Sequence, residues 1–102
     1  MNWQERNREV VKSLKKIYEG RMIFRCEVQT PGICLHFMFM SFHHRHKRRW
    51  YKLQPELLKT FNQTIIVCGA CHDFLEQHPE ESRETFERLR GPETGIANKG
   101  EM

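Results

Sequence analysis

Cysteine and histidine side chains in this sequence have the types and spacing of metal ligands. Cys68 and Cys71 form a CxxC pair that His72 follows directly, and such a pair brings two sulfurs within reach of one tetrahedral ion. The remaining cysteines, Cys26 and Cys34, are separated by seven residues, and as a second pair they would close the site with four thiolates. We therefore expect one structural Zn²⁺ on these four cysteines, with ordinary buried or paired thiols as the alternative.

An adjacent histidine pair, His43 and His44, ends an apolar run. A catalytic ion needs nitrogen or oxygen ligands and open positions, and the nitrogen donors closest to the cysteine pair and the basic cluster are these two and His72. Neighbours in a regular strand point to opposite faces, so His43 and His44 can serve one site only if the strand ends there. One imidazole could then bind metal while the other, with an ordinary pKa near neutrality, takes a proton from water.

The residues after the histidine pair outline a surface that faces phosphate. The net charge is +4, and no acidic residue occurs from position 28 to 55. A basic run without interspersed acids beside a candidate site favours contacts to a nucleic-acid backbone, and a merely solvated loop is the alternative. The cations expected to contact phosphate are Arg45, Lys47, Arg48 and Arg49.

Length and composition predict one domain. The chain has 102 residues, about the usual size of a single domain. It has neither a long uncharged apolar stretch nor a secretory signal, so we expect no membrane contact and place the protein in the cytoplasm. In that reducing compartment, cysteines are expected to hold metal rather than to pair. Residues 1–91 are predicted to fold as an α+β domain, and residues 92–102 to be a disordered tail.

The spacing of apolar residues and the positions of glycine and proline predict the helices and strands that would position these side chains. Apolar spacing predicts a helix over residues 3–19, with Gly20 as its left-handed terminal residue. Residues 33–42 are apolar on both alternating faces, which predicts a strand buried on two sides with His36 in the core. Pro55 is predicted to open a short helix, and residues 64–67 a strand that leads into the CxxC pair. Further helices are expected at about 70–77 and 79–90.

Four sequence elements stand in a fixed order along the chain. They are the cysteine pair Cys26 and Cys34, the histidine pair His43-His44, then Asn62, and last Cys68-x-x-Cys71-His72. This order resembles that of the HNH endonucleases of the ββα-metal type, particularly the small four-cysteine members of phages and bacteria. The resemblance covers about residues 26–78. It implies a ββα-metal core with an N-terminal helix and C-terminal helices, held together by the zinc site.

By this resemblance, the protein would hydrolyse phosphodiester bonds in DNA by nicking or cleavage. His43 and His72 would bind the catalytic divalent ion, which would be Mg²⁺, Mn²⁺ or another ion. His44 would be the general base and Asn62 the residue that orients it. Many relatives carry a further histidine where this chain has Glu76. Since positions 72 and 76 share a helix face, Glu76 could give the ion an oxygen or could be a surface acid.

Two other kinds of function remain open from the sequence. The same scaffold could be a zinc-stabilised module that binds nucleic acid or protein without catalysis. It could also be an accessory subunit of a phage packaging or recombination assembly, active only with a larger phage or bacterial partner. The sequence leaves open whether the chain is a monomer or a dimer, and which DNA it would prefer.

Overall fold

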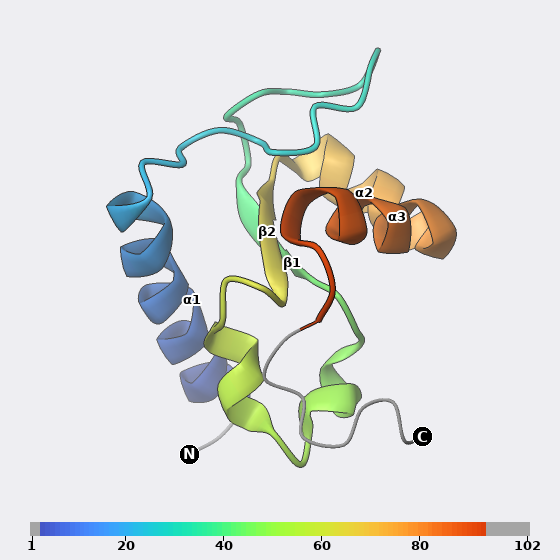
Figure 1. Cartoon of the computed structure of the whole chain (residues 1–102). Coiled ribbons are helices and arrows are strands. Elements are labelled where there is room, and N and C mark those ends of the chain that lie inside the picture. The colour runs from blue at the N-terminus through green and yellow to red at the C-terminus, as the bar shows by residue number, and fades with distance from the viewer. Residues whose placement is uncertain (1–2, 94–102) are drawn as a thin grey trace.

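The computed structural model describes residues 3–93, and positions 1–2 and 94–102 lie outside the described residues. The described part is an α+β domain with three α-helices, two 3₁₀ helices and one antiparallel sheet of two strands (Figure 1). In chain order these are α1 Trp3–Gly20, β1 Ser41–His44, η1 Arg48–Tyr51, η2 Pro55–Lys59, β2 Thr64–Val67, α2 Gly69–Gln77 and α3 Pro79–Arg90. None of the helices described is long and apolar enough to cross a membrane.

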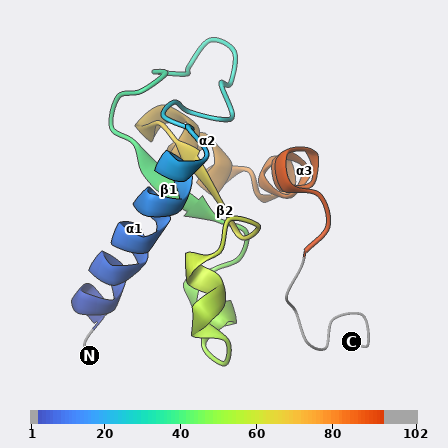
Figure 2. The same ribbon diagram turned by 60° about the vertical axis from the view of Figure 1, so that its left-hand side comes forward.

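The small sheet lies between α1 on one face and α2 with α3 on the other (Figures 1 and 2). The register places His43 opposite Ile65 and His44 opposite Thr64. Since side chains alternate along a strand, His43 and Ile65 face α2 and α3, whereas His44 and Thr64 face α1 and the 3₁₀ helices.

Each face of the sheet has its own apolar cluster. The cluster beneath α2 and α3 contains buried Cys26, Ile65, Val67, Cys68, Cys71, Leu75 and Phe86. The cluster beneath α1 contains buried Val10, Leu14, Tyr18, Tyr51, Leu57 and Leu58. A sheet of two strands is marginal by itself, so packing on both faces is what holds β1 and β2 in register.

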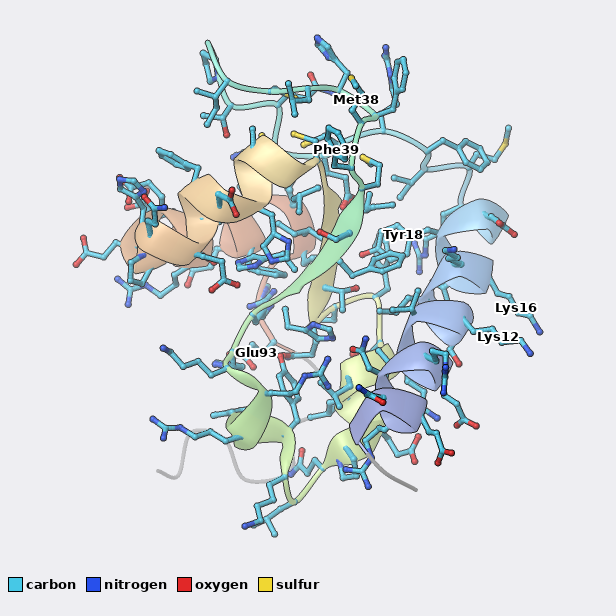
Figure 3. The ribbon with its side chains drawn as sticks, turned by 180° about the vertical axis from the view of Figure 1, so that it is seen from behind. Lys12, Lys16, Tyr18, Met38, Phe39 and Glu93 are labelled. Atoms are coloured by element: carbon cyan, nitrogen blue, oxygen red, sulfur yellow. The ribbon has the colours of Figure 1, made fainter. Side chains whose placement is uncertain are left out.

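Helix α1 forms where the sequence predicts it. Val10, Leu14 and Tyr18 recur every four residues and are buried, so they make one apolar stripe. In Figure 3, Tyr18 points toward the sheet and Lys12 and Lys16 point away from it. The expectation that Gly20 takes a left-handed conformation is wrong: Gly20 is the last helical residue. The left-handed residue is Met22, with φ 60°. Its N–H donates to the carbonyl of Glu19, three residues earlier, so the chain passes through a tighter turn of the 3₁₀ type before it leaves the helix.

The predicted strand over residues 33–42 is the main error of the sequence reading. Turns occupy most of this segment, and β1 begins only at Ser41. His36 is exposed rather than in the core and has φ 65°. The reason lies in the cysteine cluster: the backbone N–H groups of Leu35 and His36 donate at 3.2 Å to the sulfurs of Cys68 and Cys34. These hydrogen bonds bend the chain around the cysteines. In a β-strand, the same N–H groups would instead donate to a neighbouring strand.

The remaining elements agree closely with expectation. Pro55 opens η2, β2 occupies residues 64–67, and α2 and α3 cover 69–77 and 79–90. His78 has φ −131° and ψ 78°, a non-helical conformation that separates α2 from α3, as expected before a proline. Of the predicted tail, only Pro92 and Glu93 are described, and Glu93 accepts hydrogen bonds from Gln63 and His46. The rest of the tail lies outside the described residues.

Candidate active site and cysteine cluster

The four cysteines gather into one cluster although they come from two distant segments. The sulfurs of Cys26, Cys34, Cys68 and Cys71 all lie within 4.8 Å of one another, and all four cysteines are free. Cys26, Cys68 and Cys71 are buried, and Cys34 is half-buried. This arrangement suits a tetrahedral metal such as zinc, which accepts four thiolates. The cluster therefore joins the segment before β1 to the start of α2.

Backbone N–H groups favour the thiolate form of Cys68, which is the N-cap residue of α2. Leu35 N–H donates to its Sγ at 3.2 Å and Cys71 N–H at 3.4 Å. Burial alone would raise the pKa of Cys68, but these donors lower it to about 7. Burial raises the pKa of Cys71 to about 12, against the opposing effect of Thr30. A metal would displace the protons that such buried thiols retain, because only thiolates are good ligands.

His43 presents an unused nitrogen at the centre of a second group. Its ring is 6% exposed, and its Nε2 lies 2.9 Å from the Ser82 hydroxyl. Among the described residues, its Nδ1 is a buried nitrogen without a hydrogen-bond partner. Burial, followed by the charge of His72, lowers the pKa of His43 to about 4. A neutral ring whose Nε2–H donates to Ser82 leaves the lone pair of Nδ1 free for a metal.

His72 and Glu76 complete this group from one face of α2. The Ser41 hydroxyl lies 2.6 Å from His72 Nδ1, so Nε2 of His72 is left facing Glu76. The Glu76 carboxylate oxygen Oε2 lies 3.4 Å from His72 Nε2 and 3.4 Å from His43 Nδ1. Both distances exceed a good hydrogen bond. The three ligand atoms lie within 4.8 Å of one another, and two nitrogens with one carboxylate fit a divalent transition-metal ion.

His44 lies on the other face of β1 but borders the same pocket. Its Nε2 lies 2.9 Å from the carbonyl oxygen of Leu58, which can only accept, so Nε2 carries the proton and Nδ1 keeps its lone pair. Burial lowers the pKa of His44, and the Leu58 carbonyl opposes this effect only in part. His44 is therefore a neutral base at pH 7 with a fixed tautomer.

One open pocket of about 490 Å³ joins these groups. Its walls include His43, His44, His72 and Glu76, together with Arg45, His46, Lys47 and Arg48. His43 and His44 leave opposite faces of β1, whose last residue is His44, and both nevertheless line the pocket. The structure thus brings together the three imidazoles that the sequence nominated and gives them a partly basic rim.

Comparisons with protein-family models, with curated proteins and with solved structures give no match to this chain. The chemistry of the pocket therefore has to be argued from its own geometry.

The four predicted phosphate contacts differ in how free their side chains are. Lys47 and Arg49 are exposed, and Arg49 does not line the pocket. Arg48 is half-buried and donates to the side-chain oxygen of Asn7 at 2.5 Å. Arg45 donates to the carbonyls of Asn62 and Gly91, so it fastens the end of α3 to the pocket rim.

Asn62 also contacts the end of α3. Its side-chain amide donates to the carbonyls of Pro92 at 3.0 Å and Arg90 at 3.4 Å. The hydrogen bond that orients His44 comes from the Leu58 carbonyl. The expected role of Asn62 as the residue that orients His44 stays a prediction.

The sequence reading missed three groups that set the geometry of the pocket. They are the hydroxyls of Ser41 and Ser82 and the carbonyl of Leu58. A backbone carbonyl has no sequence signature, and Ser82 is 39 positions from His43. Glu76 was detectable, because a carboxylate four residues after His72 shares its helix face. The sequence left its role undecided, and the structure brings it to both imidazoles.

Proposed function

We propose that this protein is a metal-dependent endonuclease that hydrolyses phosphodiester bonds in DNA, as its resemblance to the HNH family implies. The observation that carries the proposal is the pairing of His43 Nδ1 and His72 Nε2, each 3.4 Å from Glu76 Oε2, in one pocket with neutral His44. Metal-assisted hydrolysis of a phosphodiester requires a bound metal ion with a general base beside it. The pocket offers a candidate group of metal ligands, His44 as the base, and a basic rim to face the phosphate.

The order of elements around the pocket supports a ββα-metal arrangement. Two antiparallel strands, β1 and β2, are followed directly by α2. The first strand carries His43 and His44, and the helix carries His72 and Glu76. In this proposal, the cysteine cluster is the structural zinc site, since Cys68 and Cys71 stand at the start of the same helix.

The residues of the chain divide the reaction between them. A divalent ion bound by His43, His72 and Glu76 would supply Lewis-acid stabilisation of the charge on the phosphate and the leaving oxygen. His44 accepts a proton from the attacking water at Nδ1, while the Leu58 carbonyl stabilises the imidazolium through Nε2–H. In this proposal the hydroxyls of Ser82 and Ser41 accept from His43 Nε2–H and His72 Nδ1–H, which leaves the lone pairs of His43 Nδ1 and His72 Nε2 on the side of Glu76.

The donor set narrows the choice of ion. Mg²⁺ prefers oxygen ligands, whereas two imidazoles and a carboxylate suit first-row transition metals. Among the ions expected from the sequence, Mn²⁺ is therefore the better first choice for an assay.

The exposed cations of the rim would hold the DNA backbone beside the pocket. Lys47 is exposed and lines the pocket, and Arg49 is exposed nearby in sequence. Contacts of this kind supply affinity and salt dependence but little sequence information. We therefore expect nicking with modest sequence specificity that weakens as salt rises.

The test is nicking of supercoiled plasmid in the presence of Mn²⁺. Replacement of the general base in His44→Ala should lower the nicking rate by about 100-fold or more, while DNA retardation and zinc content stay unchanged. The matched control is His78→Ala, because the His78 ring is exposed and its Nδ1 contacts only the Phe74 carbonyl among the hydrogen bonds described for it. This control should nick at the wild-type rate.

Two results would refute the endonuclease assignment. One is the absence of metal-dependent nicking over a panel of divalent ions and DNA forms. The other is a His44→Ala protein that nicks as fast as wild type. DNA retardation without any cleavage would instead favour the non-catalytic binding module.

A further inference from the structure

The loop between α1 and β1 carries a large apolar surface in water. We call residues 22–39 the apolar loop; it rises beyond the sheet and the start of α2 (Figures 1 and 2). Seven of its large side chains are exposed: Met22, Phe24, Ile33, Leu35, Phe37, Met38 and Phe39. The three phenylalanines are 59%, 65% and 74% exposed. Figure 3 places Met38 and Phe39 above the start of α2.

The apolar area that the loop exposes is large for the surface of a monomer. A fully covered aromatic side chain buries about 150–250 Å², and the three phenylalanines expose most of theirs. With the methionines and aliphatic side chains, the loop exceeds the largest apolar patch of a typical monomer, about 300–600 Å². It approaches the roughly 800 Å² per partner that a stable association of two chains buries.

The apolar loop is held in one shape by the core beneath it. Cys26 N–H donates to the His36 carbonyl at 2.7 Å, and Gly69 N–H donates to the Met38 carbonyl at 3.4 Å. Leu35 N–H donates to the sulfur of Cys68 at 3.2 Å. A surface that is already ordered loses little conformational entropy on association, so it binds more tightly than a floppy loop of equal area.

Phe39 combines a strained backbone with an exposed side chain, which favours a partner that covers it. Its φ is 56°, a left-handed conformation that costs a bulky residue about 1–2 kcal/mol. A Cβ on Gly69 would lie only 3.1 Å from the Cβ of Phe39, so the backbone of Phe39 lies tightly against α2. Phe39 nevertheless stays 74% exposed, so its side chain gains little packing energy to offset the strain.

We propose that the apolar loop is the interface of a homodimer, with the loop of a second copy as its occupant. In a two-fold interface the same patch faces itself, so any charge at its centre meets a like charge. Residues 28–44 contain no Asp, Glu, Lys or Arg. Within the loop, charge is confined to Arg25 and Glu27, which are opposite in sign and precede this stretch, so two copies can share the stretch without repulsion between like charges.

The scarcity of cations in the loop disfavours DNA as the occupant. Nucleic-acid surfaces require Lys or Arg beside their stacking residues to contact phosphate. Arg25 is the one cation of the loop, and the others lie on α1, at Arg21 and after His44. This inference concerns the oligomeric state and does not depend on the proposed nuclease activity.

The test is sedimentation equilibrium of the zinc-loaded full chain between about 1 and 100 µM, a range around micromolar dissociation constants. Wild type should change with concentration from the chain mass of 12.4 kDa to twice that mass. The double variant Phe37→Ser with Phe39→Asn should weaken dimerisation by more than about 100-fold. Asn tolerates the left-handed conformation at position 39, so the loop should keep its shape.

The control is Leu53→Ser, which changes another apolar side chain, 91% exposed and outside the loop; it should dimerise as wild type does. Two results would overturn the proposal. The first is wild-type protein that keeps the mass of one chain over the whole concentration range. This result would exclude the homodimer even if the double variant fails to fold. The second is a double variant that keeps its zinc and dimerises as strongly as wild type.

Discussion

Three hydrogen-bond partners fix which imidazole nitrogens face the pocket. The hydroxyls of Ser82 and Ser41 lie against His43 Nε2 and His72 Nδ1, and the Leu58 carbonyl accepts from His44 Nε2. Where the ring donates to its partner, the opposite nitrogen keeps a free lone pair. In the proposed nuclease, metal affinity and basicity would therefore depend on residues that contact neither metal nor substrate themselves.

Removal of the Ser82 hydroxyl should weaken the candidate metal site. Without this acceptor, the His43 proton can move to Nδ1 and donate to Glu76, which removes the lone pair that a metal needs. We expect Ser82→Ala to raise the dissociation constant for Mn²⁺ by about 10–100-fold, measured by calorimetric titration of zinc-loaded protein. Ser13→Ala, the same change in a half-buried residue of α1, should bind Mn²⁺ as wild type does. Equal affinities of the two variants would contradict this role of Ser82.

At the scale of elements, the sequence predicted those whose signals are local. The stripe of Val10, Leu14 and Tyr18 indicated α1, and His78-Pro79 indicated the break between α2 and α3. The β-branched residues 64–67 indicated β2. Each of these patterns lies within a few residues, and packing did not override any of them.

The segment from 33 to 40 failed because its conformation is set from a distance. Its alternating phenylalanines and methionines favour a buried strand, but the chain here bends around a cluster completed by Cys68 and Cys71. Sequence reasoning grouped these four cysteines correctly. It could not foresee that backbone donors at Leu35 and His36 would be used by sulfur and would leave the apolar side chains exposed.

The end of α3 is joined to the apolar loop by an ion pair that the sequence did not reveal. Arg90 Nη2 lies 2.6 Å from Glu27 Oε1, and the two side chains are 5% and 11% exposed. The same guanidinium donates to the Tyr18 hydroxyl at 3.0 Å and to the Phe61 carbonyl at 2.9 Å. Glu27 in turn accepts from the N–H of Ile66 at 3.1 Å. The pair thus connects both helices and the apolar loop to β2.

Loss of the Glu27 carboxylate should destabilise the whole domain. Glu27→Ala leaves Arg90 as an unpaired buried charge, which costs about 3–5 kcal/mol of unfolding free energy. Urea denaturation followed by circular dichroism measures this quantity. Glu84→Ala, at an exposed position of α3, should change it by less than about 0.5 kcal/mol. A small effect of Glu27→Ala would mean that the pair adds little to the fold.

At the scale of the whole molecule, helix α2 connects the cysteine cluster to the pocket. Cys68 and Cys71 lie at the start of this helix, His72 follows directly, and Glu76 lies one turn later. The cluster also fixes the apolar loop, which leads into β1 and so into His43 and His44. A metal among the four sulfurs would therefore hold both halves of the pocket in place.

Removal of that metal should affect the pocket as well as the stability of the fold. A strong zinc chelator should release one ion per chain, lower the melting temperature, and abolish Mn²⁺ binding at the pocket, since metal binding and folding are coupled in small domains. A zinc-sensitive dye and thermal denaturation measure the first two effects. A purified chain without bound metal, with four reactive thiols and unchanged melting on chelation, would show that the cysteines are ordinary thiols.

The central claim is that one chain holds two chemically different metal sites, one of sulfur and one of imidazole with carboxylate. Anomalous diffraction from a crystal soaked in Mn²⁺, collected at the zinc and manganese absorption edges, tests it most directly. We predict a zinc peak among the sulfurs of the four cysteines, and a manganese peak bonded to His43 Nδ1, His72 Nε2 and the Glu76 carboxylate. A crystal with zinc at the cysteines but no ion between His43 and His72 at saturating Mn²⁺ would contradict the account.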